Sequence, residues 1–229
     1  MPLILAIETA TKLCSVAVAR GGVVLVLREL ESDQHIHAEK VNLFIAEVIA
    51  ESGLSLTDLD AVAVGIGPGS YTGLRIGLSA AKGLCYALDI PIIGLNTLGT
   101  LVQAARSTHG PLHGTLWPMI DARRMEVFTQ PHDADGTSLA DVAPLVLDEA
   151  WATEHGPRTV FGDGADKAAE LWAGNARIIH VDGIRPSAGA MVLAAELRLA
   201  AGDHDDLAYL VPAYGKAANV GKAKEVPGR

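Results

Sequence analysis

The stretch Gly65-Ile-Gly-Pro-Gly-Ser-Tyr-Thr-Gly-Leu-Arg-Ile-Gly77 sets the architecture of the first half of the chain. The residues that lead into it, 59–65, are mostly alanine and valine, which is typical of a buried strand. Its central glycines can adopt positive φ angles and its proline restricts φ, so the chain can turn sharply. Ser70 or Thr72 can then cap a helix over residues 72–88. The pattern predicts a strand, a glycine turn and a helix in immediate succession.

A glycine turn before a helix is also a potential anion site. Unpaired amide groups and the helix dipole both favour negative charge at a helix N-terminus. The stretch lacks the Gly-Lys-Ser/Thr of a P-loop, however, and its glycine spacing differs from the dinucleotide pattern Gly-x-Gly-x-x-Gly. Arg75, one turn into the helix, can reach a phosphate or a partner's carboxylate. A phosphate ligand and a tight connection without a ligand both stay open.

Small residues line one face of the predicted helix. Gly73, Gly77 and Ala81 recur every four residues, which places them on the same side. Each glycine inside a helix costs roughly 1 kcal/mol relative to alanine, so a close neighbour must compensate. That neighbour is either the chain's own sheet or a second protein molecule. The residues alone favour internal packing.

Composition limits the classes of function. The chain has 229 residues, 49% of them hydrophobic, and a formal net charge of −9, which argues against a broad basic surface that grips nucleic acid. Cys14 and Cys85 are far apart in the sequence, so we expect buried free thiols and no zinc site. There is no basic-then-apolar leader and no apolar run of membrane-spanning length. We therefore expect a cytoplasmic protein without a membrane contact.

The order of the remaining patterns predicts an α/β fold. Three antiparallel strands followed by alternating helices and parallel strands form a ribonuclease-H-like mixed sheet, and a less regular second half follows. We expect a first subdomain over 1–104, a reduced second subdomain over 105–214 whose last helix packs back on the first, and a flexible basic tail over 215–229. The predicted strands are 3–7, 14–19, 22–28, 60–66, 90–95, 112–120, 125–129 and 177–181, and the predicted helices are 36–51, 72–88, 165–173 and 188–201.

Five motifs are spread over most of the chain: Leu5-Ala-Ile-Glu-Thr-Ala10, Ile66 to Gly77, Ile120-Asp-Ala-Arg-Arg-Met-Glu-Val-Phe128, Gly162-Asp-Gly-Ala165 and Arg185-Pro-Ser-Ala188. Together they resemble the TsaB (YeaZ) family, the bacterial tRNA threonylcarbamoyladenosine biosynthesis subunits related to glycoproteases. The glycine stretch, Ile66 to Gly77, is the most specific of the five.

The resemblance implies a fold, a role and partners. The fold is of the actin/Hsp70/sugar-kinase type with two subdomains. The role is that of a non-catalytic scaffold that binds and supports a TsaD-like transferase, which attaches a threonylcarbamoyl group to N6 of an adenosine in tRNA. A TsaE-like ATPase is a further partner, self-association as a homodimer is expected, and direct tRNA contact is expected to be slight. No cofactor is required by this chain, although ATP or ADP at the partner interface stays open.

The predicted partner interface combines the small-residue helix with the helix before it. Two such surfaces can pack as a four-helix contact. On this interpretation Gly77→Trp abolishes association and leaves the fold intact. The interface residues are His37, Val41, Phe44, Gly73, Leu74, Gly77, Leu78 and Ala81.

A complete nucleotide cleft is doubtful. In kinases and ATPases of the wider fold the first phosphate loop carries an Asp, and this chain has Glu8 there. The nearest candidate for a second loop, Gly162-Asp163-Gly164, lacks a hydroxyl residue. If nucleotide binds at all, the residues that would face it are Glu8, Gly67, Gly69, Ser70, Tyr71, Thr72 and Arg75.

Catalytic and metal-binding residues are not expected. The related transferase TsaD carries a His-x-x-x-His pair on its first helix, but four residues after His35 and His37 this chain has Glu39 and Val41. Ser70 has no neighbouring histidine in the sequence, and the turn Asp121-Ala-Arg-Arg124 is equally compatible with a salt-bridged surface loop. Two alternatives stay open: an independent metallopeptidase-like or kinase-type enzyme of the same superfamily, and a nucleotide-binding module.

Overall fold

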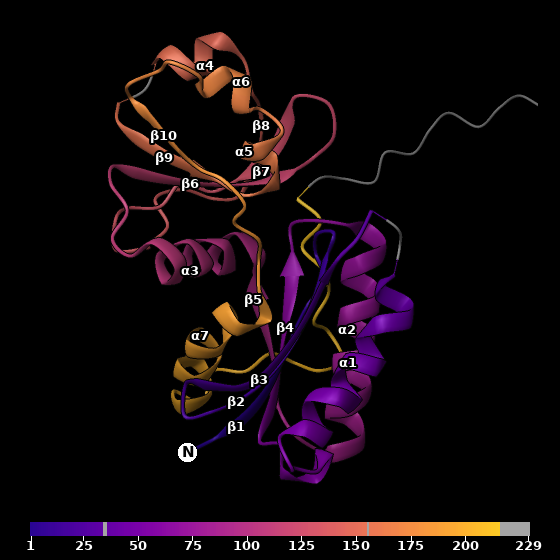
Figure 1. Ribbon diagram of the computed structural model, residues 1–229. Coiled ribbons are helices and arrows are strands. Elements are labelled where there is room, and N and C mark those ends of the chain that lie inside the picture. The colour runs from indigo at the N-terminus through magenta and orange to yellow at the C-terminus, as the bar shows by residue number, and fades with distance from the viewer. Residues whose placement is uncertain (34–35, 155, 216–229) are drawn as a thin grey trace, which may run out of the picture.

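The computed structural model describes residues 1–33, 36–154 and 156–215. Figure 1 shows two lobes, each built on a five-stranded sheet, with helix α3 (Thr97–His109) between them. Both sheets combine parallel and antiparallel strand pairs. The predicted fold class, a ribonuclease-H-like α/β fold of the actin/Hsp70/sugar-kinase type, is confirmed.

The first sheet has the strand order β3-β2-β1-β4-β5. β1 pairs antiparallel with β2 and parallel with β4, and β4 pairs parallel with β5. Helices cover both faces of this sheet, which explains why its central strands are continuous apolar runs. The strands are β1 (Leu3–Glu8), β2 (Leu13–Arg20), β3 (Val23–Glu31), β4 (Ala61–Gly67) and β5 (Ile92–Asn96).

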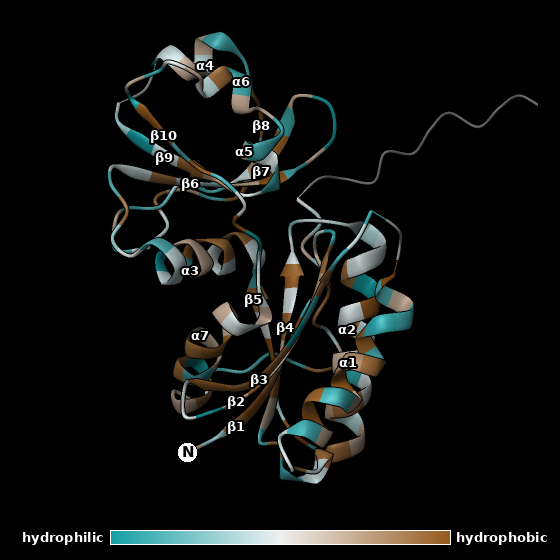
Figure 2. Ribbon diagram, in the orientation of Figure 1, coloured by the Kyte–Doolittle hydropathy of each residue, from teal (hydrophilic) through white to brown (hydrophobic). Residues whose placement is uncertain are grey.

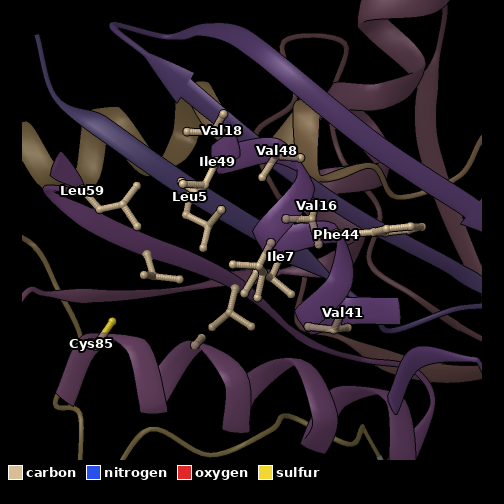
Figure 3. Packing of buried hydrophobic residues seen from close by; sticks show 14 of the residues in the cluster. Leu5, Ile7, Val16, Val18, Val41, Phe44, Val48, Ile49, Leu59 and Cys85 are labelled. Carbon is tan, nitrogen blue, oxygen red and sulfur yellow. The ribbon is translucent and has the colours of Figure 1, made fainter. Parts of the chain in front are cut away.

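The two faces of this sheet carry side chains of different size. Leu5 and Ile7 of β1 lie on the face covered by α1 (His37–Glu51) and α2 (Tyr71–Leu88), among the large apolar side chains drawn in Figure 3. Ala6 lies on the other face, which is rich in alanine and packs against α7 (Ala188–Ala200). Because successive strand residues point to opposite faces, this alternation lets α7 lie close to the sheet. Figure 2 shows the matching contrast between hydrophobic strands and helices with hydrophilic segments.

The second lobe is built from shorter elements. Its sheet has the order β10-β9-β6-β7-β8, and its core contains the edge-to-face pairs Trp117–Trp151 and Trp151–Trp172. The buried Arg158 guanidinium lies 4.2 Å from the centroid of the Trp151 ring. The elements of this lobe are β6 (Thr115–Asp121), β7 (Glu126–Thr129), β8 (Ala143–Val146), β9 (Arg158–Phe161), β10 (Ile178–Val181), α4 (Glu149–Glu154), α5 (Asp163–Asp166) and α6 (Ala169–Trp172). In the first lobe, a 3-10 turn (Leu56–Asp58) precedes β4.

Several elements were not predicted. The sequence pattern missed α3, β8, α4 and β9, and the predicted helix over 165–173 is two short helices. Strands of four residues are too short to show a clear period. Helix α3 begins with Thr97, Gly99 and Thr100, which have low helix propensity, and is capped by Asn96, whose side chain accepts hydrogen bonds from two backbone amides. The predicted subdomain boundary at residue 104 falls within this helix.

The last described residues return to the first lobe as a C-terminal strap, residues 203–215 (Figure 1, yellow). The Asp205 amide donates to the Ile92 carbonyl at 3.0 Å, and the Gly94 amide donates to the Asp205 carboxylate at 2.7 Å. Further along, the Ala213 amide donates to the Ile66 carbonyl at 2.7 Å. The strap therefore covers the β5 edge of the sheet and reaches the glycine turn. Residues 216–229 of the predicted tail lie outside the described residues.

Two expectations from composition can be compared with the structure. Cys14 and Cys85 are buried free thiols, as predicted, and burial raises the pKa of each to about 11. Among the helices of the described chain, none combines the length and the apolar character needed to cross a bilayer.

The small-residue face of α2 packs inside the chain. A Cβ atom on Gly73 would overlap the Thr9 carbonyl, and one on Gly77 would overlap the Thr9 hydroxyl. The Thr9 hydroxyl donates to the Gly73 carbonyl at 2.8 Å. The internal-packing alternative is therefore the one observed, and the expectation that Gly77→Trp leaves the fold intact is wrong because no room exists for the side chain.

We expect Gly77→Ala to lower the free energy of unfolding by about 1–3 kcal/mol, because the added methyl group forces α2 away from Thr9. Gly83→Ala on the same helix is the matched control, since Gly83 is exposed and a Cβ atom added there would meet nothing within 4 Å. That control is expected to be stabilised by up to about 1 kcal/mol. Urea unfolding of both variants measures the difference. Equal stability of Gly77→Ala and wild type would contradict the tight packing.

Candidate functional site

Glu8 lies where the β1–β2 turn meets β4 and α3. Its side chain is fully buried, and its carboxylate accepts hydrogen bonds from the Ala10 amide at 2.8 Å and the Thr97 hydroxyl at 3.3 Å. A Cβ atom on Gly65 would overlap this carboxylate, so glycine is required there. Burial raises the pKa of Glu8 to about 7. The expectation that Glu8 faces a nucleotide is therefore incorrect, because its side chain points into the protein.

Three amides of the glycine turn and the start of α2 donate hydrogen bonds within the chain. The Gly67 amide donates to the Thr97 hydroxyl at 3.2 Å, and the Ser70 amide donates to the Ala10 carbonyl at 2.7 Å. Of the two predicted caps, Ser70 and Thr72, Ser70 is the N-cap of α2, and its hydroxyl accepts a hydrogen bond from the Gly73 amide. Gly69, with φ of 155°, lies against the Ala10 carbonyl. The turn thus joins α2 to the β1–β2 turn and to α3, and the Gly67, Ser70 and Gly73 amides are used within the chain.

The predicted nucleotide-facing residues consequently separate into two groups. Glu8, Gly67, Gly69 and Ser70 serve the junction between turns. The remaining three lie on a different surface, where they line a groove of about 590 Å³ between α1 and α2. The groove is lined by Ala38, Val41, Asn42, Tyr71, Thr72, Arg75, Ile76, Ser79 and Ala80.

The predicted partner-interface residues are buried, and most of them do not line this groove. Of the eight, Val41 lines it, and every one is buried within the first lobe. His37 is an example, because its Nε2 atom lies 2.9 Å from the Thr11 carbonyl and so ties α1 to the β1–β2 turn. On α2, Gly73 and Gly77 face Thr9 inside the first lobe, so this face is internal in the folded chain. The buried residues are His37, Val41, Phe44, Gly73, Leu74, Gly77, Leu78 and Ala81.

The exposed face of α2 carried a signal that the prediction did not use. Tyr71, Arg75, Ser79 and Tyr86 follow one another at helical spacing, and all are exposed. Tyr71 is 52% exposed although it is aromatic, and the Arg75 guanidinium lies 4.0 Å from the centroid of its ring. A polar and aromatic stripe opposite a small-residue stripe is what a helix with one internal and one binding face would show.

A second polar cluster connects the lobes. Arg185 donates to Glu31 of β3 at 2.7 Å and to Asp166 of α5 at 2.6 Å, and His180 Nε2 lies 3.0 Å from Asp166. Asp166, His180 and Asp182 each place one potential metal ligand within 4.8 Å of the others. Asp166 is already shared by Arg185 and His180, which fits a clamp between the lobes. A metal site at His35 and Glu39, which the sequence analysis did not expect, cannot be compared with the structure because His35 lies outside the described residues.

The second-lobe loops are also tied down. Asp121 pairs with Lys167, and the Asp163 carboxylate accepts from the Asp121 amide at 3.0 Å. Burial raises the pKa of Asp163. A Cβ atom on Gly164 would lie 2.9 Å from the Met119 carbonyl carbon, so this loop packs directly on β6. The turn after β6 is the salt-bridged surface loop that the sequence allowed.

We expect the stability of the protein to fall as pH rises through the titration of Glu8. Because its pKa is raised to about 7, Glu8 holds its proton more tightly in the folded state than in the unfolded state. The free energy of unfolding therefore begins to fall near pH 4.5 and is lower by about 3 kcal/mol above pH 7. Glu8→Gln, which cannot ionise, is expected to be the more stable protein at pH 8 and to lose this slope. Urea unfolding at several pH values tests it, with the exposed Glu39→Gln as control. Parallel profiles for wild type and Glu8→Gln would contradict the assignment.

Comparison with known proteins places these features in a family. The family model described as "TsaD: tRNA N6-adenosine threonylcarbamoyltransferase" matches residues 20–158. The chain is 35% identical to the tRNA threonylcarbamoyladenosine biosynthesis protein TsaB of Escherichia coli (strain K12) over 168 residues, which are 70% of this chain and 71% of that protein. An uncharacterized protein of Mycobacterium bovis, Mb3455c, is 34% identical over 212 residues, 92% of this chain and 90% of that protein.

A solved structure agrees with the sequence relatives. The structure of YeaZ from Pseudomonas aeruginosa superposes with a TM-score of 0.78 at 25% identity, covering 93% of this chain and all of that chain. The similarity therefore extends over both lobes. The family suggested by the motifs is confirmed, and the chain belongs to the TsaB (YeaZ) family.

Proposed function

We propose that this protein is a non-catalytic subunit in the formation of N6-threonylcarbamoyladenosine in tRNA, and that it binds and supports a TsaD-like transferase. The observation that carries the non-catalytic part is the burial of Glu8 together with the internal use of the glycine-turn amides. A carboxylate that acted on a phosphate or its metal ion would have to reach the ligand. The pathway follows from the name of the TsaB relative in Escherichia coli.

The α1–α2 groove is the surface we assign to the transferase. Its walls are two helices, and small side chains such as Ala38, Ser79 and Ala80 leave room for another helix pair to approach. Tyr71 and Arg75 at its edge belong to the residue types that most often dominate binding energy. Because a partner with the same fold would present a similar helix pair, the groove can also accept a second copy of this chain. The homodimer then competes with the heterodimer.

Three further ligands or partners belong to this proposal: tRNA, a nucleotide and a TsaE-like ATPase. The formal net charge of −9 favours little direct contact with tRNA by this chain. ATP or ADP at the partner interface would meet Tyr71, Thr72 and Arg75, the three predicted nucleotide-facing residues that line the groove. A TsaE-like ATPase would act on the assembled complex.

We expect Ser79→Trp to weaken both self-association and transferase binding by more than about tenfold, because the indole fills the groove. Ala87→Trp is the control, since Ala87 is exposed on the same helix outside the groove. Sedimentation velocity measures self-association, calorimetry measures transferase binding, and thermal unfolding checks that both variants fold. Wild-type binding by Ser79→Trp would exclude this groove as the interface.

An omit-one reconstitution tests the proposed role itself. Modified adenosine is quantified after tRNA is mixed with the adenylate synthase, the transferase and the ATPase, with and without this chain. We expect product only when this chain is present, and none from this chain alone. Equal product without it would overturn the role. Product from this chain alone would favour an independent enzyme.

A further inference from the structure

The end of the C-terminal strap is fastened to the edge of the α1–α2 groove. The Tyr214 ring lies 4.7 Å from the Tyr71 ring, centroid to centroid, with an interplanar angle of 31°. The Arg75 Nε atom donates to the Tyr214 hydroxyl at 2.9 Å. Arg75 is held on its other side by the Tyr71 ring, 4.0 Å from its guanidinium carbon. Tyr214 thus contacts two groove residues and does not itself line the groove.

Other contacts hold the strap in place without Tyr214. Asp205 is bonded to β5, the Lys82 ammonium donates to the Ala208 carbonyl at 3.1 Å, and the Ala213 amide donates to Ile66. A Cβ atom on Gly67 would overlap the Ala213 carbonyl, which shows how closely the strap crosses the glycine turn. The strap therefore delivers Tyr214 to a defined position. Because these contacts do not involve Tyr214, substituting Tyr214 tests its effect on the groove residues while the rest of the strap stays attached.

We propose that Tyr214 is a positioning residue for partner binding, which presents Tyr71 and Arg75 to the partner in one arrangement. This inference rests on the groove being the transferase interface proposed above. An exposed arginine ordinarily samples many rotamers, and ordering such a side chain on binding reduces affinity. Here the hydrogen bond to the Tyr214 hydroxyl orients the Arg75 guanidinium, and the contact with the Tyr214 ring orients the Tyr71 ring. The partner meets a surface that is already ordered.

Two substitutions divide this role into its parts. Tyr214→Phe keeps the ring against Tyr71 and removes the acceptor for Arg75, whereas Tyr214→Ala removes both. We expect transferase binding to weaken about threefold for Tyr214→Phe and about tenfold for Tyr214→Ala. Tyr209→Ala is the matched control, because Tyr209 lies on the same strap and is 82% exposed. It is expected to bind like wild type.

A double-mutant cycle separates positioning from a general effect on the fold. In a Tyr71→Ala/Arg75→Ala background, Tyr214→Ala is expected to cause no further loss of affinity, because the groups through which it acts are gone. Calorimetry with the transferase measures affinity, and sedimentation velocity measures self-association as a second readout. Thermal unfolding identifies any variant that fails to fold. If Tyr214→Ala fails to fold, the affinity of Tyr214→Phe tests the inference in its place.

The outcomes are distinct. Weaker binding that disappears in the double background supports the inference. Wild-type affinity in Tyr214→Ala, or an undiminished loss in the double background, overturns it and leaves the proposed function standing. If the wild-type chain does not bind the transferase at all, the proposed interface and this inference both fail.

Discussion

The contact between Thr9 and the glycine face of α2 organises the first lobe. Two glycines, one turn apart, let the helix lie against the backbone and hydroxyl of the β1–β2 turn without a side chain between them. This approach sets which face of α2 is internal. The opposite face, with Tyr71 and Arg75, is left for solvent or a partner. A loss of roughly 1 kcal/mol in helix propensity at each glycine is offset by this packing.

A second close approach, between Gly65 and Glu8, encloses an ionisable group at the end of β1. Glu8 is enclosed by Gly65 and Thr97 and acts as a buried hydrogen-bond acceptor that holds three segments together. The glycine turn that follows β4 uses its Gly67 and Ser70 amides to bind neighbouring parts of the chain. Features that suggest a phosphate site in the sequence thus stabilise a junction in the structure. Both turns therefore serve as structural parts of the first lobe.

Chain segments that are distant in sequence complete this surface. Alanines on one face of the first sheet allow α7 to pack closely, and the chain leaving α7 crosses back to β5 and the glycine turn. It then brings Tyr214 to its hydrogen-bond partner Arg75, which is 139 residues away in the sequence. Arg185, in the connection before α7, bonds to both lobes. The lobes and the groove are therefore joined through the C-terminal part of the chain.

Local patterns in the sequence were sufficient to predict the β1–β5 framework, a cap at Ser70 or Thr72 and the buried thiols, because long apolar runs, glycines and caps act locally. The family was indicated by the resemblance of five motifs. Local patterns were not sufficient for the short elements of the second lobe, whose strands of four residues have no readable period. They favoured internal packing of the small-residue face of α2 but did not identify its neighbour. That neighbour is Thr9, 64 residues before Gly73. The exposed surface of α2 became evident only in the folded chain, because packing between distant segments sets exposure.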